Sequence, residues 1–326
     1  MAARKRQDLE GELNDVRDAA AAPDEPESRK KLTAALASKR AMVVERAAKV
    51  VRERSLSDFS TALRDAYQRL LEGGAKADPG CRAKVAVLEA LDVLEWTDHE
   101  PFLSATRYVQ EEAAWGPPVD TASGVRVRGV LALARLGYAE LPILAGERFE
   151  DSQPPVRAAV ADALAAFGER SSAGLLLHKL RVGDEDPLVK LACMSALMAL
   201  APDWGLPYLS PLIATGTGEA RELAALALGQ SHRPDAADVL IAALESAVRA
   251  SEREAVLRGL GLHRSDRAAD VLLALIETGA AADARAAVKA LAPRRFEPGL
   301  REKIVAHAAR NARVDLEDTL AKALAD

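Results

Sequence analysis

The chain has 326 residues, of which 49% are apolar and only 4% aromatic, and its formal net charge is −5 with 29% charged residues. The scarcity of aromatic side chains disfavours one large globular core, and the prevalence of Ala, Leu and Val favours helices that pack closely against each other. The acidic balance lacks the positive charge typical of general nucleic-acid binders, which leaves only a local basic stripe for such a role.

The sequence carries no sign of export or membrane insertion. Residues 1–27 are charged throughout, without the apolar core of a secretory signal, and every helical segment further on contains charged residues. Cys81 and Cys193 lie far apart and form no C-x-x-C pair, which disfavours a disulfide framework and a cysteine-based zinc site. We therefore expect a soluble, cytoplasmic protein that does not contact a membrane.

The N-terminal third of the chain is predicted to be helical but irregular. We expect residues 1–26 to form a charged extension that is partly mobile, because its helix candidate breaks after Ala22 at a Pro-Asp-Glu-Pro run. Residues 27–120 contain two loose copies of an amphipathic pattern, at Val44–Val51 and Asp78–Leu91, which predict irregular helix pairs. The long connection that follows, over residues 97–123, is expected to form an ordered loop or a short extra helix.

Residues 121–310 carry a repeat with a nearly constant period. A small residue followed by Leu recurs six times, and the spacings between successive Leu residues are 31, 33, 31, 32 and 31. Each period contains a second stretch with apolar residues at helical spacing, and short polar turns separate the two. One helix–turn–helix unit of this size cannot bury its apolar face alone, so successive units are expected to stack. The motif leucines are Leu133, Leu164, Leu197, Leu228, Leu260 and Leu291.

Two further features mark the ends of these elements. Gly137, Gly168, Gly229 and Gly261 end or nearly end the motif helices, as C-terminal glycines do. Residues 311–326 read as a short helix with few features of the repeat, and we expect it to cap the stack.

The motif resembles the HEAT-repeat family, in the short bacterial form also seen in phycobilisome-lyase-like repeats. The resemblance rests on a D-x-x-P-x-V-R-x-x-A-A-x-A-L pattern, best matched at Asp151–Leu164 and Asp184–Leu197. It implies a right-handed α-solenoid of stacked antiparallel helix pairs. It also implies that the basic residue of each motif pairs with an Asp between the helices, for which Asp151, Asp184 and Asp186 are available.

This recurrent basic position forms a ladder, with Arg82 as an earlier copy. A row of cations along a groove could meet phosphates or an acidic peptide. The structural reading is favoured, because paired charges commonly hold neighbouring elements in register. The ladder residues are Arg126, Arg157, Lys190, Arg221 and Arg253.

Candidate contacts to a partner lie elsewhere. The position before each small-Leu pair changes from unit to unit, so packing does not demand it, and by the helical period it lies away from Leu164 and its equivalents. We expect it on the concave surface, the usual binding face of solenoids. Trp115 lies in a Trp-Gly-Pro-Pro loop, where exposure would mark a contact site. The candidates at the variable position are Asp162, Ser195, Arg258 and Lys289.

No motif for catalysis, a cofactor or a metal is found. The five histidines lack the spacing of a zinc site, and neither a G-x-S-x-G elbow nor a kinase-like motif exists. The interpretation is a non-catalytic scaffold, not an enzyme, that binds a partner protein or peptide on its concave face without a metal or cofactor. Two alternatives remain open: a nucleic-acid-binding protein like the HEAT-like DNA glycosylases, and a bilin-lyase-like chromophore accessory protein.

Overall fold

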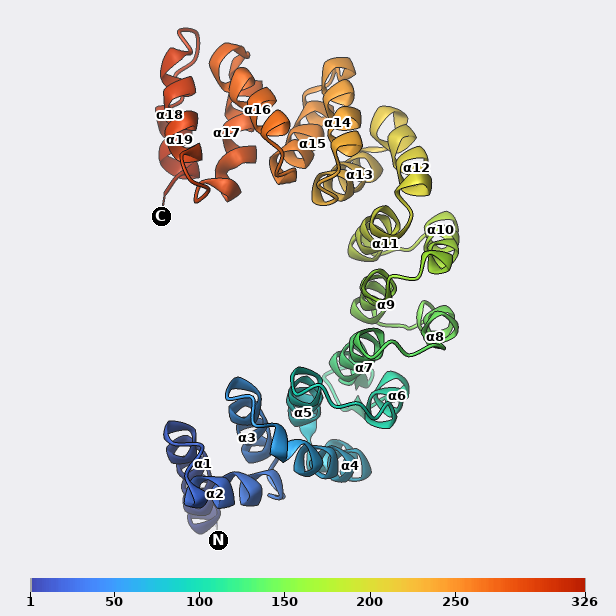
Figure 1. Cartoon of the computed structure of the whole chain (residues 1–326), viewed down its shortest axis with the longest axis vertical. Coiled ribbons are helices and arrows are strands. Elements are labelled where there is room, and N and C mark those ends of the chain that lie inside the picture. Colours follow the sequence, from blue (N-terminus) through green and yellow to red (C-terminus); the bar gives the residue numbers. More distant parts are fainter. Residues whose placement is uncertain (1, 326) are drawn as a thin grey trace. The chain divides into compact units, whose positions relative to one another are not determined.

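The computed structural model describes the fold of residues 2–325 and the side chains of residues 8–325, and this part of the chain is almost entirely helical (Figure 1). The only strands within it are the two short ones of a hairpin. The predicted all-α fold of stacked helix pairs is therefore confirmed. Met1 and Asp326, the outermost residues of the predicted extension and cap, lie outside the described residues.

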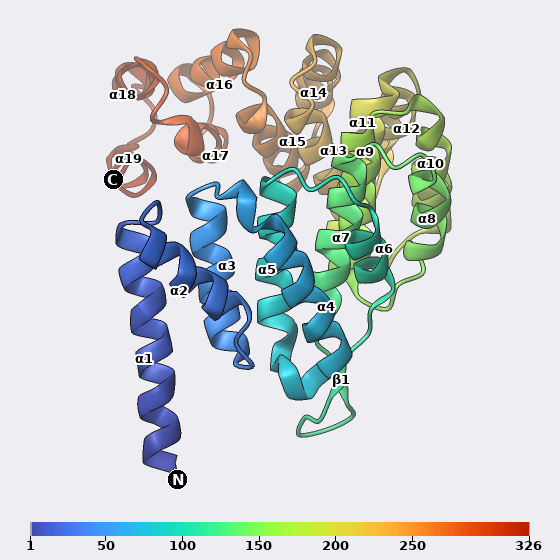
Figure 2. The ribbon, with the colours of Figure 1, turned by 60° about the horizontal axis from the view of Figure 1, so that its bottom comes forward.

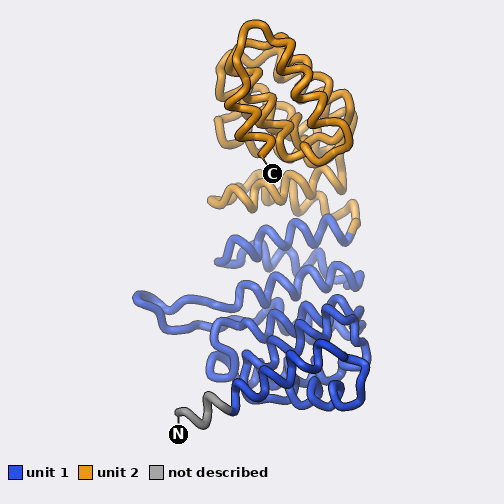
Figure 3. The backbone as a smooth tube through the Cα atoms, turned by 90° about the vertical axis from the view of Figure 1, so that its left-hand side faces the viewer, with its two compact units in different colours: residues 1–167 blue, residues 168–326 orange. Residues whose placement is uncertain are grey.

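The helices form two compact units, which we call unit 1 (residues 1–167) and unit 2 (residues 168–326) (Figure 3). The finer division expected at residues 26, 120 and 310 stays a prediction. Unit 1 comprises α1 (Ala2–Ala21), α2 (Pro26–Leu36), α3 (Ala41–Glu53), η1 (Ser57–Phe59), α4 (Ser60–Ala77), η2 (Pro79–Cys81), α5 (Arg82–Val93), α6 (Glu100–Arg107), β1 (Glu111–Glu112), β2 (Val119–Asp120), α7 (Ser123–Arg135), α8 (Leu141–Arg148) and α9 (Pro154–Phe167). Unit 2 comprises η3 (Arg170–Ser172), α10 (Ala173–Val182), α11 (Pro187–Leu200), α12 (Pro202–Thr215), α13 (Gly218–Gln230), α14 (Pro234–Ser246), α15 (Ala250–Leu262), α16 (Asp266–Thr278), α17 (Ala281–Leu291), η4 (Ala292–Arg294), α18 (Leu300–Arg310) and α19 (Glu317–Ala323).

Each unit is built of two layers of helices (Figures 1 and 2). In unit 1, α3, α5, α7 and α9 pack side by side, and α4, α6 and α8 lie behind them. In unit 2, α11, α13, α15 and α17 pack in the same way, with α12, α14 and α16 behind. We call the row of odd-numbered helices from α3 to α9, and that from α11 to α17, the inner layer of the respective unit. The N-terminal α1 packs against α2 and α3.

Turn chemistry explains where the helices of unit 2 begin. Asp186 caps α11 by accepting a hydrogen bond from the N–H of Leu188, and Pro187 occupies the first helical position. Thr217 and Ser265 cap α13 and α16 through their hydroxyl oxygens. These three turns thus satisfy N–H groups that the helix itself leaves without partners.

The core lies between the two layers. All six motif leucines are fully buried, at 0% exposure, so the phase of the repeat seen in the sequence is the phase of the core. Alanines of the inner helices fill the space between neighbours in the same layer. No helix within the described residues is long and apolar enough to cross a bilayer, and the predicted cytoplasmic location stays a prediction.

The motif glycines serve two purposes. Gly137 and Gly168 follow α7 and α9 with φ of +66° and +78°, the left-handed conformation that closes a helix. Gly229 and Gly261 lie inside the last turns of α13 and α15. A Cβ at Gly229 would collide with the carbonyl of Gly259, and one at Gly261 with the carbonyl of Ala290. The inner helices of unit 2 therefore touch backbone to backbone, which makes their row the tighter of the two layers.

The long connection contains a short extra helix, one of the two expected forms, and also a hairpin that was not expected. It contains α6 and a hairpin in which Glu111 pairs with Asp120 and Glu112 with Val119. Strands of two residues are too short to show an alternating pattern, which is why the sequence analysis did not predict them.

Candidate functional site

The basic ladder of unit 2 joins successive inner helices. Lys190 on α11 pairs with Glu219 on α13, and Arg221 on α13 lies 3.3 Å from Glu252 on α15. Arg253 on α15 pairs with Asp283 on α17 at 2.7 Å and also donates to the Leu244 carbonyl. Each of these cations thus reaches an acid of the next inner helix.

In unit 1 the ladder is buried more deeply. Arg126 is 1% exposed and donates to Asp120 at 2.6 Å, to Asp151 at 2.8 Å and to the Tyr108 carbonyl at 2.9 Å. Burial alone would lower the pKa of Arg126, but hydrogen bonds to the two carboxylates outweigh it and raise that pKa. Arg157 is also buried and donates to the Asp151 carbonyl.

The Asp residues between the helices have several partners. Asp151 accepts hydrogen bonds from Arg126, while Asp184 lies 3.0 Å from Lys179 and Asp186 caps α11. The ladder cations thus make their contacts within the protein, and the assignment of a role to them stays a prediction.

The structure brings two of the variable-position residues onto neighbouring inner helices of unit 2. Arg258 on α15 lies between Glu222 on α13 and Glu254 on its own helix, 2.8 Å from the latter. Glu254 is also close enough to Lys289 on α17 for that cation to lower its pKa, after the larger effect of Arg258. A hollow of about 170 Å³ lies here between α13 and α15.

The other two candidates of this set make different contacts. Ser195 donates to the Gln230 side chain at 2.9 Å, and Asp162 is exposed on α9 in unit 1. The role of the variable position in binding a partner on a concave surface stays a prediction.

A cluster of ion pairs that was not predicted from the sequence lies on the inner layer of unit 1. Glu45 on α3 lies 2.6 Å from Lys49 and 3.1 Å from Arg82 on α5. Glu89 on α5 pairs with Arg52 on α3 and, at 2.7 Å, with Arg128 on α7. Both carboxylates are largely buried, at 12% and 19% exposure of the side chain, whereas the cations around them are more exposed. We call the surface formed by Arg46, Lys49, Arg52, Arg82, Arg128, Glu45 and Glu89 the basic inner face.

Five cations and two carboxylates give this face a positive balance. The next pair along it, Asp92 with Arg135, contributes one charge of each sign. Burial alone would raise the pKa of Glu45, but the hydrogen bonds from Lys49 and Arg82 outweigh it and hold that pKa below its ordinary value. The Glu45 carboxylate is therefore charged at neutral pH.

The sequence contained only part of the signal for this face. Glu45 and Lys49 are four residues apart, which is the helical spacing of an ion pair. The ion pairs of this face that join different helices connect residues 37 to 39 positions apart, in the region where the repeat period is irregular. Register across helices could not be read there, and Arg82 was identified only as an early copy of the ladder.

A hollow of about 460 Å³ lies at one end of the basic inner face. Ala41, Met42 and Pro79 give it apolar walls, and Met42 is 58% exposed. Arg46 and Arg82 are among the cations that line it.

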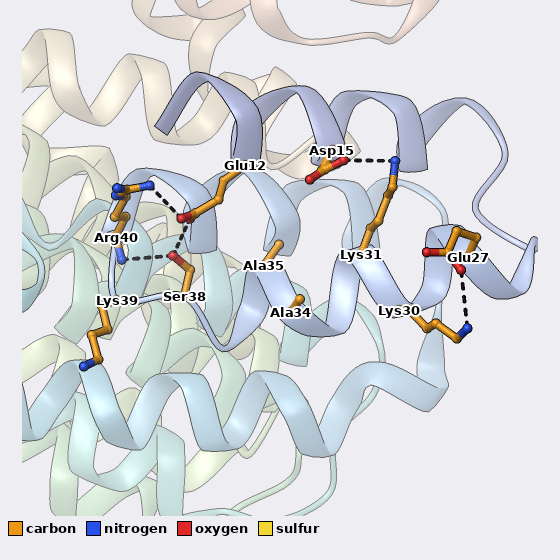
Figure 4. A pocket seen from close by; sticks show the side chains of 10 residues that line it. All are labelled: Glu12, Asp15, Glu27, Lys30, Lys31, Ala34, Ala35, Ser38, Lys39 and Arg40. Atoms are coloured by element: carbon orange, nitrogen blue, oxygen red, sulfur yellow. Dashed lines mark hydrogen bonds and ion pairs between the residues drawn. The ribbon is translucent and has the colours of Figure 1, made fainter. Parts of the chain in front are cut away.

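A hollow of about 960 Å³ lies over α1 and α2 (Figure 4). Lys31 reaches Asp15 at 2.9 Å, and Arg40 reaches Glu12 at 2.6 Å. The hydrogen bond to Asp15 raises the pKa of Lys31. Four cations and three carboxylates line this hollow, and each carboxylate pairs with one cation, so the balance is a single positive charge.

Trp115 lies near the tip of the β1–β2 hairpin and is fully exposed. Val109 and Val119, at the base of the hairpin, are 57% and 51% exposed. The hairpin projects from unit 1 (Figure 3). The predicted contact residue is thus presented to the outside on a short ribbon.

The base of this hairpin is held by buried polar groups. The Gln110 amide donates to Glu112 at 2.7 Å, and Glu112 also accepts the backbone N–H of Gly80 at 2.7 Å. The side chain of Lys84, which is 0% exposed, donates to Gln110 at 3.1 Å and lies 3.5 Å from Asp78. Arg126 holds the second strand through Asp120. Two buried cations therefore fix the ribbon from which Trp115 projects, and buried charges are costly unless they are paired in this way.

Few groups offer reactive chemistry. Among residues 8–325, no group of three or more His, Cys, Asp and Glu side chains lies close enough to hold a metal ion. Cys81 and Cys193 are buried free thiols, and burial raises the pKa of Cys81, which makes its thiolate less accessible.

Comparison with known proteins gives matches in structure only. No family model matches the chain, and no curated protein matches it. The complex of CpcE and CpcF of phycocyanin lyase from Nostoc sp. PCC7120 matches with a TM-score of 0.41 and 20% identity, over 74% of this chain and 91% of that chain. Human deoxyhypusine hydroxylase in complex with glycerol matches with a TM-score of 0.32 and 16% identity, over 81% of this chain and 95% of that chain. These values assign neither an activity nor a partner to this chain.

The prediction that the chain is not an enzyme is contradicted by this comparison. Both matched structures bear the names of enzymes, a lyase and a hydroxylase. The prediction failed because it took the absence of contiguous catalytic motifs as decisive, whereas a fold of this kind can carry catalytic groups that are far apart in the sequence.

The architecture defines the class of fold. Helix pairs repeat with a period near 32 residues, their motif leucines form one continuous core in each unit, and cations of one inner helix pair with acids of the next. The fold of each unit is that of an α-helical repeat protein.

Proposed function

We propose that the protein binds an acidic segment of a partner protein along the basic inner face of unit 1. The single observation that supports this function is the arrangement of Glu45 and Glu89, each of which lies between two cations of neighbouring helices. The carboxylates are largely buried and the cations are more exposed, so a ligand that approaches the face meets the positive charges first. Solenoids of stacked repeats commonly bind partners along such an extended face.

Carboxylates of a peptide suit this face better than a nucleic acid. A duplex carries one charge in about 1.7 Å of its axis, and its binding requires several phosphates to be neutralised together. Here four of the five cations already share two carboxylates, and the whole chain has a net charge of −5. A small positive excess spread over three helices matches a segment with a few spaced Asp or Glu side chains.

The test is binding of a fluorescent, Asp- and Glu-rich peptide to the full chain, followed by anisotropy from low to high ionic strength. We expect binding that weakens with salt, because the cations are exposed to solvent. Arg128→Ala should weaken it by roughly fivefold, the upper range for an exposed charge. Arg64→Ala on α4 is the matched control, since the two arginine side chains are 45% and 44% exposed and Arg64 lies in the layer behind.

Three results would contradict the proposal. One is equal weakening by both substitutions, and another is the absence of binding at low salt. The third is tighter binding of a duplex DNA of equal charge, which would favour the nucleic-acid alternative. The residues Asp162, Ser195, Arg258 and Lys289 stay predicted contacts for a partner.

A further inference from the structure

The hairpin and the 460 Å³ hollow of unit 1 each combine exposed apolar surface with charge, and the two charges are of opposite sign. The hairpin offers the exposed Trp115 above a neck that carries the exposed carboxylate of Glu111. The hollow has apolar walls and is lined by three cations and by the carboxylates of Glu45 and Asp78, so its charge balance is positive by one. An indole ring prefers such a site, because its body is apolar and its face attracts a nearby Arg or Lys.

Both features belong to one surface of unit 1. The backbone N–H of Gly80 donates to Glu112 of β1, and the preceding residue, Pro79, is a wall of the hollow. The projecting side chain and the hollow are thus joined by a fixed contact. A surface that carries both halves of a contact can meet a copy of itself across a twofold axis, and each copy then gives and receives one Trp.

We propose that two copies of the protein form a twofold dimer in which Trp115 of each copy enters the hollow between α3 and α5 of the other. Met42 and Pro79 contact the ring, and the Arg46 guanidinium lies toward Glu111 of the hairpin that enters. The proposal rests on the hairpin and the hollow and does not depend on the acidic partner.

The architecture of the hairpin supports this role. A fully exposed Trp leaves a large apolar area in water, and such area on a protein surface commonly marks a contact site. Its base is held by the buried network around Gln110 and Arg126, so little conformational freedom is lost when the ring is bound. The exposed carboxylate of Glu111 disfavours binding of the hairpin to an anionic lipid surface. The positive balance of the hollow favours binding of the hairpin there.

Sedimentation velocity of the full chain, from low to high micromolar concentration, tests the dimer. We expect a reversible monomer–dimer equilibrium that Trp115→Ala weakens by roughly thirtyfold or more, the effect of removing a central aromatic contact. Trp115 packs against nothing in the monomer, so this variant should unfold at the same urea concentration as the parent. Met42→Glu, which places a charge in the hollow, should weaken the dimer in a similar way.

A charge exchange separates this contact from any other mode of association. Glu111→Arg and Arg46→Glu should each weaken the dimer, and the chain with both substitutions should regain it, because the two charges meet across the interface. A parent that stays monomeric at every concentration would overturn the proposal. Dimers that survive Trp115→Ala, or open polymers in place of dimers, would also overturn it.

Discussion

In the inner layers of both units a central charged residue pairs with two residues of opposite charge, but the sign of the central charge differs between the units. In unit 1, Glu89 lies between Arg52 and Arg128, whereas in unit 2, Arg258 lies between Glu222 and Glu254. In both cases the central group joins neighbouring inner helices. Ion pairs between neighbouring inner helices are therefore common to both units. The sign of the excess charge differs between the units and can serve to recognise a partner.

The units also differ in how they hold the ladder cation. The Arg126 side chain in unit 1 is 2% exposed and binds two carboxylates and a carbonyl, while the Arg253 side chain in unit 2 is 23% exposed and binds one carboxylate and the Leu244 carbonyl. The deeper burial in unit 1 coincides with the hairpin that Arg126 fixes. The same position of the repeat thus contacts the base of the hairpin in unit 1 and the next inner helix in unit 2.

Loss of the buried ladder cation should have the largest effect. Arg126→Ala leaves the Asp120 and Asp151 carboxylates without their main partner, and breaking a buried pair in this way costs about 3–5 kcal/mol. Arg253→Ala should cost only about 1 kcal/mol, because its site is open to water. Urea unfolding of both variants measures the difference, and equal losses would show that the two ladders are energetically alike.

The close contact of the inner helices in unit 2 gives the next largest effect. Gly259→Ala would drive a Cβ into the carbonyl of Ala225, which should destabilise the chain by about 1–3 kcal/mol. Gly146→Ala on α8 is the matched control, because nothing lies within 4 Å of its Cβ and Ala favours a helix by about 1 kcal/mol. Thermal unfolding should shift in opposite directions for the two variants. A shift in the same direction would mean that the backbones are not in contact.

The fold was largely predictable because its signal is repeated. The spacing of the motif leucines placed every one of Leu133, Leu164, Leu197, Leu228, Leu260 and Leu291 in the core. The basic inner face was not predictable in the same way. Glu89 and Arg128 are distant in sequence, and they meet only because α5 and α7 pack in a register that the irregular spacing before residue 121 concealed.

The hairpin shows a different limit of sequence reasoning. Trp115 could be singled out from its Gly-Pro-Pro context, but the network that presents it could not. Lys84, Gln110 and Glu112 meet through folding of the long connection, and no periodic pattern records such contacts. Irregular segments are specified by individual hydrogen bonds, which leave little trace in the sequence.

Acid should weaken unit 1 through Asp120. Burial alone would raise the pKa of this carboxyl, but hydrogen bonds from Arg126 outweigh it and hold the pKa below its ordinary value of 3.8. The folded state therefore binds fewer protons than the unfolded state near that pH, so the stabilisation is full above pH 3.8 and is lost as the pH falls through the lowered pKa. Asp120→Asn should be less stable than the parent by about 1.5 kcal/mol at neutral pH, and urea unfolding should show this gap closing in acid. A gap that persists in acid would mean that the charge of Asp120 is not what stabilises the base of the hairpin.

The smallest effect tests the opposite signs of the two inner layers directly. Glu89→Gln removes the central carboxylate of unit 1 and leaves Arg52 and Arg128 without neutralisation, so the acidic peptide should bind more tightly, by roughly threefold. Glu222→Gln in unit 2 removes a carboxylate as well, but Arg258 keeps its pair with Glu254. That variant should change the affinity less, although both substitutions alter the net charge of the chain by the same amount. Equal gains would show that the peptide senses only the total charge, whereas a larger gain with Glu89→Gln would place it on α3, α5 and α7, where the excess of cations lies.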